Sequence, residues 1–183
     1  SNGDFSIMSE LRTNRIVPRD GLTSGTGKGG GVIQVVHTST STLLNTTTAN
    51  TDFDTHLTGT ITPTRADSKI FITVSQVITV RSTASGNYQM ALSLVRTPSG
   101  GSSTTIIDGT NGGNGQNIAG RSDGVSAYNF IQLPIHLNKL DEPATTSAVT
   151  YKTIARLLTS STGTMKCQED GVQSFMTLME ISG

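Results

Sequence analysis

The sequence contains no tryptophan, only 4% aromatic residues and a single cysteine. One cysteine excludes an intrachain disulfide, and we expect Cys167 to be a small, half-buried apolar side chain. Charged residues make up only 14% of the chain, and the net charge is +0, so no long-range field attracts nucleic acid or an anionic membrane. A basic stripe with interleaved aromatic residues is also missing, which leaves nucleic-acid binding unsupported.

Long hydrophobic runs are absent as well. No apolar stretch is long enough to cross a bilayer, so we expect no membrane insertion. No basic start followed by a short apolar stretch marks a signal peptide. These absences are consistent with a protein that is assembled into a particle in the cytoplasm of a host cell.

The residues that are abundant favour strands. Beside 33% hydrophobic residues, the chain is mostly Thr, Ser, Gly and Asn. Thr and Ser compete for backbone hydrogen bonds and Gly costs backbone entropy, so this composition disfavours helices. A length of 183 residues suits one domain with a real core plus an arm.

The best-specified stretch runs from Ile61 to Val80, ITPTRADSKIFITVSQVITV. From Ile70 onward nearly every residue is β-branched, aromatic or small. Ile70, Ile72 and Val74 fall on one face of a strand, and Phe71 and Thr73 fall on the other. A two-residue period predicts a central strand of an antiparallel sheet.

Other strands are predicted from similar alternation. They are expected at Val32–Val36, His56–Thr62, Tyr88–Arg96, Gly124–Leu137, Val149–Leu158, Met165–Cys167 and Phe175–Ile181. Val32–Val36 is expected to be a short buried run, and Leu43 and Leu44 an inward-facing pair. About eight or nine short strands with regular turn signals predict an all-β fold, an antiparallel β-sandwich of jelly-roll type.

The last predicted strand, Phe175–Ile181, is apolar on both faces. A strand of this kind needs cover on both sides. The sandwich core would cover one face and a neighbouring subunit the other. We therefore expect a homo-oligomer.

Residues 1–31 differ from the rest of the chain. Scattered apolar residues are followed by the glycine-rich connector TSGTGKGGG. The prediction is an extended anchoring arm with a flexible linker over residues 1–31 and a head domain over residues 32–183. Within the head, residues 97–123 are predicted to form one long polar loop, and loops of that length are usually functional or flexible.

Catalytic and cofactor motifs are not recognised. Residues 25–30 match the spacing G-x-G-x-x-G, but no strand precedes them and no βαβ unit follows, so they are expected to form a linker. The histidines His37, His56 and His136 lack metal-ligand spacing. The acidic residues beside Phe53 and Pro143 are expected to be solvated turn acids, namely Asp52, Asp54, Asp141 and Glu142. No catalytic residue, metal or cofactor is predicted, although carboxylates can meet in space to cleave a glycoside.

Several phrases of the sequence resemble a module of tailed-bacteriophage virion proteins, found in tail fibres and minor structural proteins of cyanobacterial and other marine phages. These phrases are SELRTNRIVPRDG, GGGVIQVV, ITPTRADSKIFITVS, LDEPATTSAVTYK and the closing TLMEI. The resemblance covers nearly the whole chain from Ser9. It implies a virion component, a trimer and a jelly-roll head similar to fibre tips that touch the host.

On this resemblance, residues 1–31 would bind other virion proteins and the long loop would face a host receptor, either a glycan or a protein. The candidate anchoring residues are Leu11, Ile16, Val17 and Pro18, and the candidate receptor-facing residues are Asn111, Asn114, Gln116, Asn117 and Arg121. The prediction is a non-enzymatic short tail fibre or fibre tip. Two alternatives stay open: a capsid decoration or fibre-adaptor protein without a receptor role, and a polysaccharide-cleaving tailspike head.

Overall fold

The computed structural model describes residues 31–82, 86–109, 118–125, 129–159 and 163–182. Strands dominate this part of the chain, and its helical content is one turn of 3-10 helix at Glu169–Gly171. The strands are β1 (Val32–Thr40), β2 (Leu44–Thr46), β3 (Asp52–Ile61), β4 (Lys69–Ser82), β5 (Gly86–Pro98), β6 (Thr104–Ile107), β7 (Ile118–Val125), β8 (Asn129–Asp141), β9 (Val149–Thr159), β10 (Gly163–Cys167) and β11 (Ser174–Ile181). No helix in the described ranges is long and apolar enough to span a membrane.

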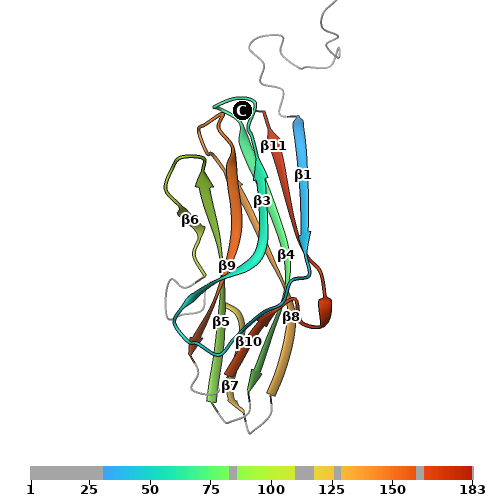
Figure 1. Ribbon diagram of the computed structural model, residues 1–183, viewed down its shortest axis with the longest axis vertical. Coiled ribbons are helices and arrows are strands. Elements are labelled where there is room, and N and C mark those ends of the chain that lie inside the picture. Colours follow the sequence, from blue (N-terminus) through green and yellow to red (C-terminus); the bar gives the residue numbers. More distant parts are fainter. Residues whose placement is uncertain (1–30, 83–85, 110–117, 126–128, 160–162, 183) are drawn as a thin grey trace, which may run out of the picture.

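The strands pair in a nested order. β1 pairs with β11, β3 with β9, and β4 with β8, all antiparallel. In the innermost pairs of this order, β5 pairs with both β6 and β7. A chain folded back on itself in this way and rolled into two sheets is a jelly roll, so the predicted fold class is confirmed (Figure 1).

Each sheet is built around one long central strand. The first sheet, here called the β4 sheet, has the order β1-β11-β4-β10-β2, with β8 along the other edge of β4. The second, the β5 sheet, has the order β3-β9-β5-β6, with β7 also beside β5. β4 is the predicted central strand, and β11 is inner as expected, because it lies between β1 and β4.

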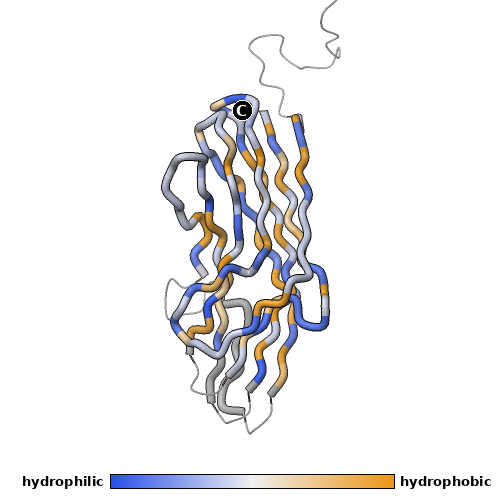
Figure 2. The backbone as a smooth tube through the Cα atoms, viewed as in Figure 1, coloured by the Kyte–Doolittle hydropathy of each residue, from blue (hydrophilic) through white to orange (hydrophobic). Residues whose placement is uncertain are grey.

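The core lies between the two sheets and follows the alternation of the sequence (Figure 2). Ile70, Ile72 and Val74 share one face of β4, as predicted, and the structure shows that this face is buried. Opposite them, β5 and β9 contribute Leu92, Leu94 and other buried side chains. Burying each such aliphatic side chain contributes about 1.5–3 kcal/mol, so this layer is the main source of stability.

A buried polar cluster joins the sheets at one end of the core. Asp141, on β8 of the β4 sheet, is only 6% exposed. It accepts hydrogen bonds from the Tyr151 hydroxyl at 2.7 Å and from Arg96 at 2.9 Å, both on the β5 sheet. Burial and the hydrogen bond to Asp141 raise the pKa of Tyr151, so the phenol stays protonated and keeps donating.

A second buried carboxylate, Glu180 of β11, ties three segments together. It accepts hydrogen bonds from Gln34 of β1 at 2.6 Å and from the backbone and hydroxyl of Thr64 at 2.7 Å. Burial alone would raise the pKa of Glu180, but the nearby Ser68 hydroxyl and the hydrogen bonds from Gln34 and Thr64 lower it. Glu180 therefore stays ionised and fixes the segment between β3 and β4 onto the β4 sheet.

Two predictions about the first strands are wrong. The run Val32–Val36 is not a buried strand: β1 continues to Thr40 and is an edge strand, on which Val32 is 57% and Val35 56% exposed. Leu43 and Leu44 are not an inward pair, because Leu44 is buried and Leu43 is 49% exposed. Adjacent strand residues point to opposite faces, so a pair of neighbours cannot both enter the core.

The predicted polar loop over residues 97–123 is also wrong in part. β6 lies inside this range and β7 begins inside it, and both strands pair with β5. The β6 sequence, TTII, is β-branched but only four residues long, and the β7 sequence, IAGRSDGV, carries too few apolar residues to mark a strand. The backbone of β5 supplies their hydrogen bonds, and this long-range partner is invisible in the local pattern.

The prediction that four acidic residues are solvated turn acids is wrong for Asp141, and for Asp52 and Asp54 it is right about exposure but wrong about the turn. Asp141 is buried in the polar cluster, at the end of a β8 that continues through Pro134. Asp52 and Asp54 are exposed residues of β3, and they pair with Arg156 and Lys152 of β9. Glu142 is exposed outside the strands, as expected.

Glu180→Gln should make folding less stable by about 2 kcal/mol at neutral pH, because an amide cannot accept all the hydrogen bonds that the carboxylate accepts. The pKa of Glu180 is lowered by folding, so its contribution is present above the unfolded pKa and is lost as the pH falls through the lowered value. Urea unfolding at a series of pH values should show the difference between wild type and variant shrinking in acid. A matched change at the exposed Glu142, Glu142→Gln, should leave the unfolding midpoint nearly unchanged, and equal effects at both positions would contradict the role of Glu180.

Candidate functional site

The outward face of the β4 sheet carries an apolar row that runs across four strands. The strand register places Val35 of β1 opposite Met179 of β11, Met179 opposite Phe71 of β4, and Phe71 opposite Leu140 of β8. The two ends of the row are open to solvent, with Val35 56% and Leu140 46% exposed. At the start of β1 a β-bulge between Val32 and Gln34 interrupts the regular alternation of faces. Val32 and Ile33 at this bulge and the four residues of the row are together called the apolar band.

The band forms because several strands carry apolar residues on their outward face. The outward positions of an exposed sheet normally carry polar residues. In β1, β11 and β4 the outward residues at this level, Val35, Met179 and Phe71, are all apolar. A connected apolar patch on a protein surface marks a site of contact with another molecule.

Beyond the band, the same face becomes polar. The next outward row consists of Thr177, Thr73 and Asn138 in register. The row after it consists of Phe175, Ser75 and His136. These six side chains surround a shallow hollow on the face of the sheet.

The outward face of the β5 sheet holds a second, smaller hollow. It has a volume of about 240 Å³, and Asp52, Asp108 and Arg156 are among its lining residues. Nε of Arg156 donates to Asp52 at 2.6 Å, and this hydrogen bond raises the pKa of Arg156. A glycoside-cleaving pair needs one carboxyl group that can donate a proton, whereas Asp52 accepts a hydrogen bond from a guanidinium group here.

Groups that could bind a metal are dispersed in the part of the chain that the structure describes. No three His, Cys, Asp or Glu side chains gather there in a metal-binding arrangement. Cys167 is fully buried, more deeply than the half-buried position expected from the sequence. Burial raises the pKa of the Cys167 thiol to about 12, so its reactive thiolate form is rare at neutral pH.

The residues predicted as sites fall outside the described structure. This applies to the anchoring residues Leu11, Ile16, Val17 and Pro18, and to the receptor-facing residues Asn111, Asn114, Gln116 and Asn117. Arg121 lies on β7, opposite Gln89 of β5, but its side chain is outside the described part. Their assigned roles therefore stay predictions.

The candidate surface on the β4 sheet was only partly visible in the sequence. The sequence predicts that both faces of β11 are apolar and that Phe71 and Thr73 share one face of β4, but it does not say which face of β4 is outward. The missing information was the register, since Val35, Met179, Phe71 and Leu140 are far apart in the chain and meet only through strand pairing. The exposed valines of β1 were misread as core residues for the same reason.

The protein was compared with known families, sequences and structures. No protein-family model and no curated protein matches the sequence. Among solved structures, a chain in the structure of infectious bursal disease virus Gt strain matches with a TM-score of 0.39 and 9% identity, and one in the Gx strain structure with a TM-score of 0.33 and 8% identity. Each match covers 91% of this chain and 44% of the other, so this chain spans less than half the length of those it matches. At these TM-scores the likeness carries no argument about function.

The buried position of Cys167 leads to a testable expectation. In the folded protein, a thiol-specific reagent such as 5,5′-dithiobis(2-nitrobenzoic acid) should react with Cys167 far more slowly than with the unfolded chain, because the thiol is covered and protonated. The absorbance of the released dye measures both rates, and the urea-unfolded protein is the control. Rapid reaction under native conditions would contradict the position of Cys167 in the core.

Proposed function

We propose that the protein is a structural component of a tailed-phage virion, a trimeric short tail fibre or fibre tip. Its head is the jelly roll, its arm at residues 1–31 binds other virion proteins, and the head contacts the host surface. The resemblance of the sequence phrases to tail-fibre modules supports the particle and the trimer. The observation that carries the proposal is the apolar band on the β4 sheet.

The band supports self-association for a physical reason. Covering an apolar side chain releases the water in contact with it. The free energy of association becomes more favourable by about 25 cal/mol for each Å² of apolar surface that is buried. The band lies on one face of a sheet and reaches from one edge strand, β1, to the other, β8. A second copy of the chain would cover several of its six side chains at once.

The position of the predicted arm fits the same model. β1 begins at Val32, directly after the glycine-rich linker, and Val32 and Ile33 belong to the band. The arm therefore leaves the head at the level of the proposed contact between subunits. A capsid decoration or adaptor protein would share these features, so the location of the chain in the particle separates the two functions.

Replacement of band residues by acids tests self-association. The double variant with Val35→Asp and Leu140→Asp should sediment as a monomer where the wild type sediments as a trimer, since two charges cannot be buried in an apolar contact without a large cost. Both residues are exposed, so the thermal melt of the isolated subunit should be preserved. Leu43→Asp is the matched control, because Leu43 is 49% exposed but outside the band. A monomeric wild type at micromolar concentration, or a trimeric double variant, would overturn the proposal.

Removal of residues 1–31 tests the arm. The truncated protein should keep its jelly roll, because the strands described by the structure begin at Val32, but it should no longer enter phage particles. The fraction of labelled protein that co-sediments with purified virions measures incorporation, with the full chain as control. A truncated chain that enters virions as well as the full chain would show that the arm is not the anchor.

A further inference from the structure

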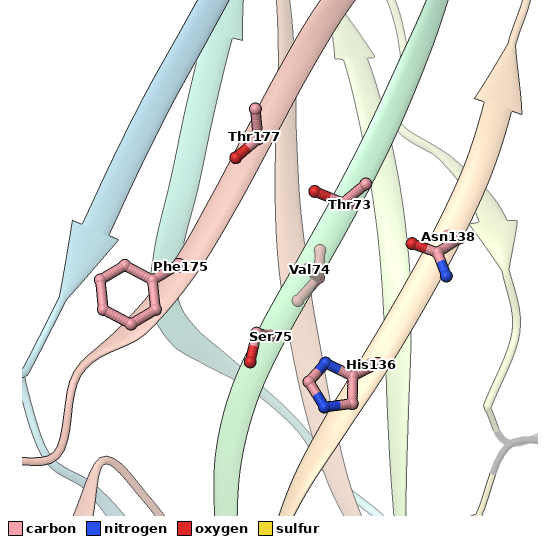
Figure 3. Close-up of a pocket in the computed structure, with 7 residues that line it drawn as sticks. All are labelled: Thr73, Val74, Ser75, His136, Asn138, Phe175 and Thr177. Carbon is pink, nitrogen blue, oxygen red and sulfur yellow. The ribbon is translucent and has the colours of Figure 1, made fainter.

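The hollow on the outward face of the β4 sheet has the composition of a ligand site. It has a volume of about 330 Å³ and lies over the middle of the sheet, where β11, β4 and β8 run side by side (Figure 3). Its shape follows from the sequence: small Ser75 on the central strand lies between Phe175 and His136 on the two neighbouring strands. Neighbouring strands are about 4.8 Å apart, so the two rings stand on strands roughly 10 Å apart with a low floor between them.

The polar groups gather along one side of this floor. Thr177, Thr73 and Asn138 form the row next to Ser75 (Figure 3). Three hydroxyl groups and one amide can each donate and accept hydrogen bonds. Within the described residues, no other side chain or backbone group occupies the side-chain hydrogen-bonding atoms of Thr73, Ser75 or Asn138, so they are available to a ligand.

His37 of β1 holds one wall of the hollow in place. Its ring stacks on Phe175 with the ring centres 5.7 Å apart. Its Nδ1 lies 3.0 Å from the hydroxyl oxygen of Thr177. The aromatic wall and one of the hydroxyl groups are therefore fixed before a ligand arrives, which reduces the entropy lost on binding.

The lining also indicates the charge of the ligand. Among the described residues, no Lys, Arg, Asp or Glu side chain lines the hollow, and its polar groups are hydroxyls, an amide and an imidazole. A charged ligand would find no counter-ion there. A neutral ligand with many hydroxyl groups and one apolar C–H face would find hydrogen-bond partners on one side and the Phe175 ring on the other.

We propose that this hollow binds a neutral sugar residue of a glycan, with its C–H face against Phe175 and its hydroxyl groups on Thr73, Ser75 and Asn138. This inference rests on the proposed function only in that the glycan would belong to the host surface. Weak binding at one subunit would be multiplied by the copies in an oligomer. The contact would then lie on the sheet itself, and it would use residues other than those predicted from the sequence to face the receptor.

Sugar binding can be measured on the full-length protein. The probes are the methyl glycosides of glucose, galactose, mannose and N-acetylglucosamine, with N-acetylneuraminic acid and glucuronic acid as acidic comparisons. Saturation-transfer difference NMR followed by titration should give a dissociation constant in the millimolar range for at least one neutral glycoside and no binding of the acids. The hollow is adjacent to the apolar band, so wild type and variants are compared at the same oligomeric state.

Two variants and two matched controls locate the site. Ser75→Phe should abolish binding by filling the floor, and Phe175→Ala should raise the dissociation constant about tenfold or more, equivalent to 1.4 kcal/mol. Phe130→Ala removes a different exposed ring of the same sheet, and Thr60→Phe adds a ring to the outward face of β3. Both controls should bind like wild type, and thermal melts show which variants are folded.

Three outcomes would overturn the inference. These are no binding of any neutral glycoside well into the millimolar range, tighter binding of the acidic sugars, and unchanged binding in folded Ser75→Phe and Phe175→Ala. None of these outcomes affects the test of virion incorporation, which uses no sugar. Conversely, a protein that binds the neutral glycoside but does not enter virions would disprove the proposed function and leave the sugar site intact.

Discussion

The structure depends on the burial of one face of β4. This strand is hydrogen-bonded along both edges, to β8 on one side and to β11 and β10 on the other, so its position organises the whole first sheet. Its even-numbered residues supply the centre of the core. A strand paired on both edges and covered on one face has only its outward face left for contact with other molecules.

That outward face has two regions with different chemistry. At one level, the register aligns Val35, Met179, Phe71 and Leu140. This apolar row can be buried against an apolar surface of another molecule. The hollow begins two residues further along β4, where rings and hydroxyl groups replace aliphatic side chains. Pairing between neighbouring strands fixes the positions of the side chains, so the antiparallel sheet holds both regions in a set arrangement. The proposed subunit contact and the proposed sugar site therefore lie on one face of the sheet.

The buried charges explain how such a small core stays specific. Asp141 and Glu180 lie at separate places, and each accepts hydrogen bonds from groups on other segments. A buried carboxylate is costly unless all of its oxygens are satisfied. Misaligned strands would leave these oxygens without donors, so the two carboxylates favour one register over its neighbours.

Local pattern failed where the partner of a strand is distant. β6 and β7 lack a strong strand signal, and they exist because β5 offers an unpaired edge. The apolar start of β1 is typical of a core strand, but its place at the edge of the sheet leaves Val32 and Val35 exposed. Asp141 follows an apolar strand and precedes Glu142 and Pro143, which predicts a solvated turn, yet Arg96 and Tyr151 reach it from the other sheet.

The sequence by itself determined the all-β fold class, the central strand, the shared face of Ile70, Ile72 and Val74 on that strand, and the two-sided apolar character of the last strand. Alternation with a period of two is a local property, so these features follow from neighbouring residues alone. Only the tertiary structure decided the nested pairing, the apolar band and the hollow between Phe175 and His136. The physical reason is that strand register joins residues more than a hundred positions apart, and no local pattern records which of them will meet.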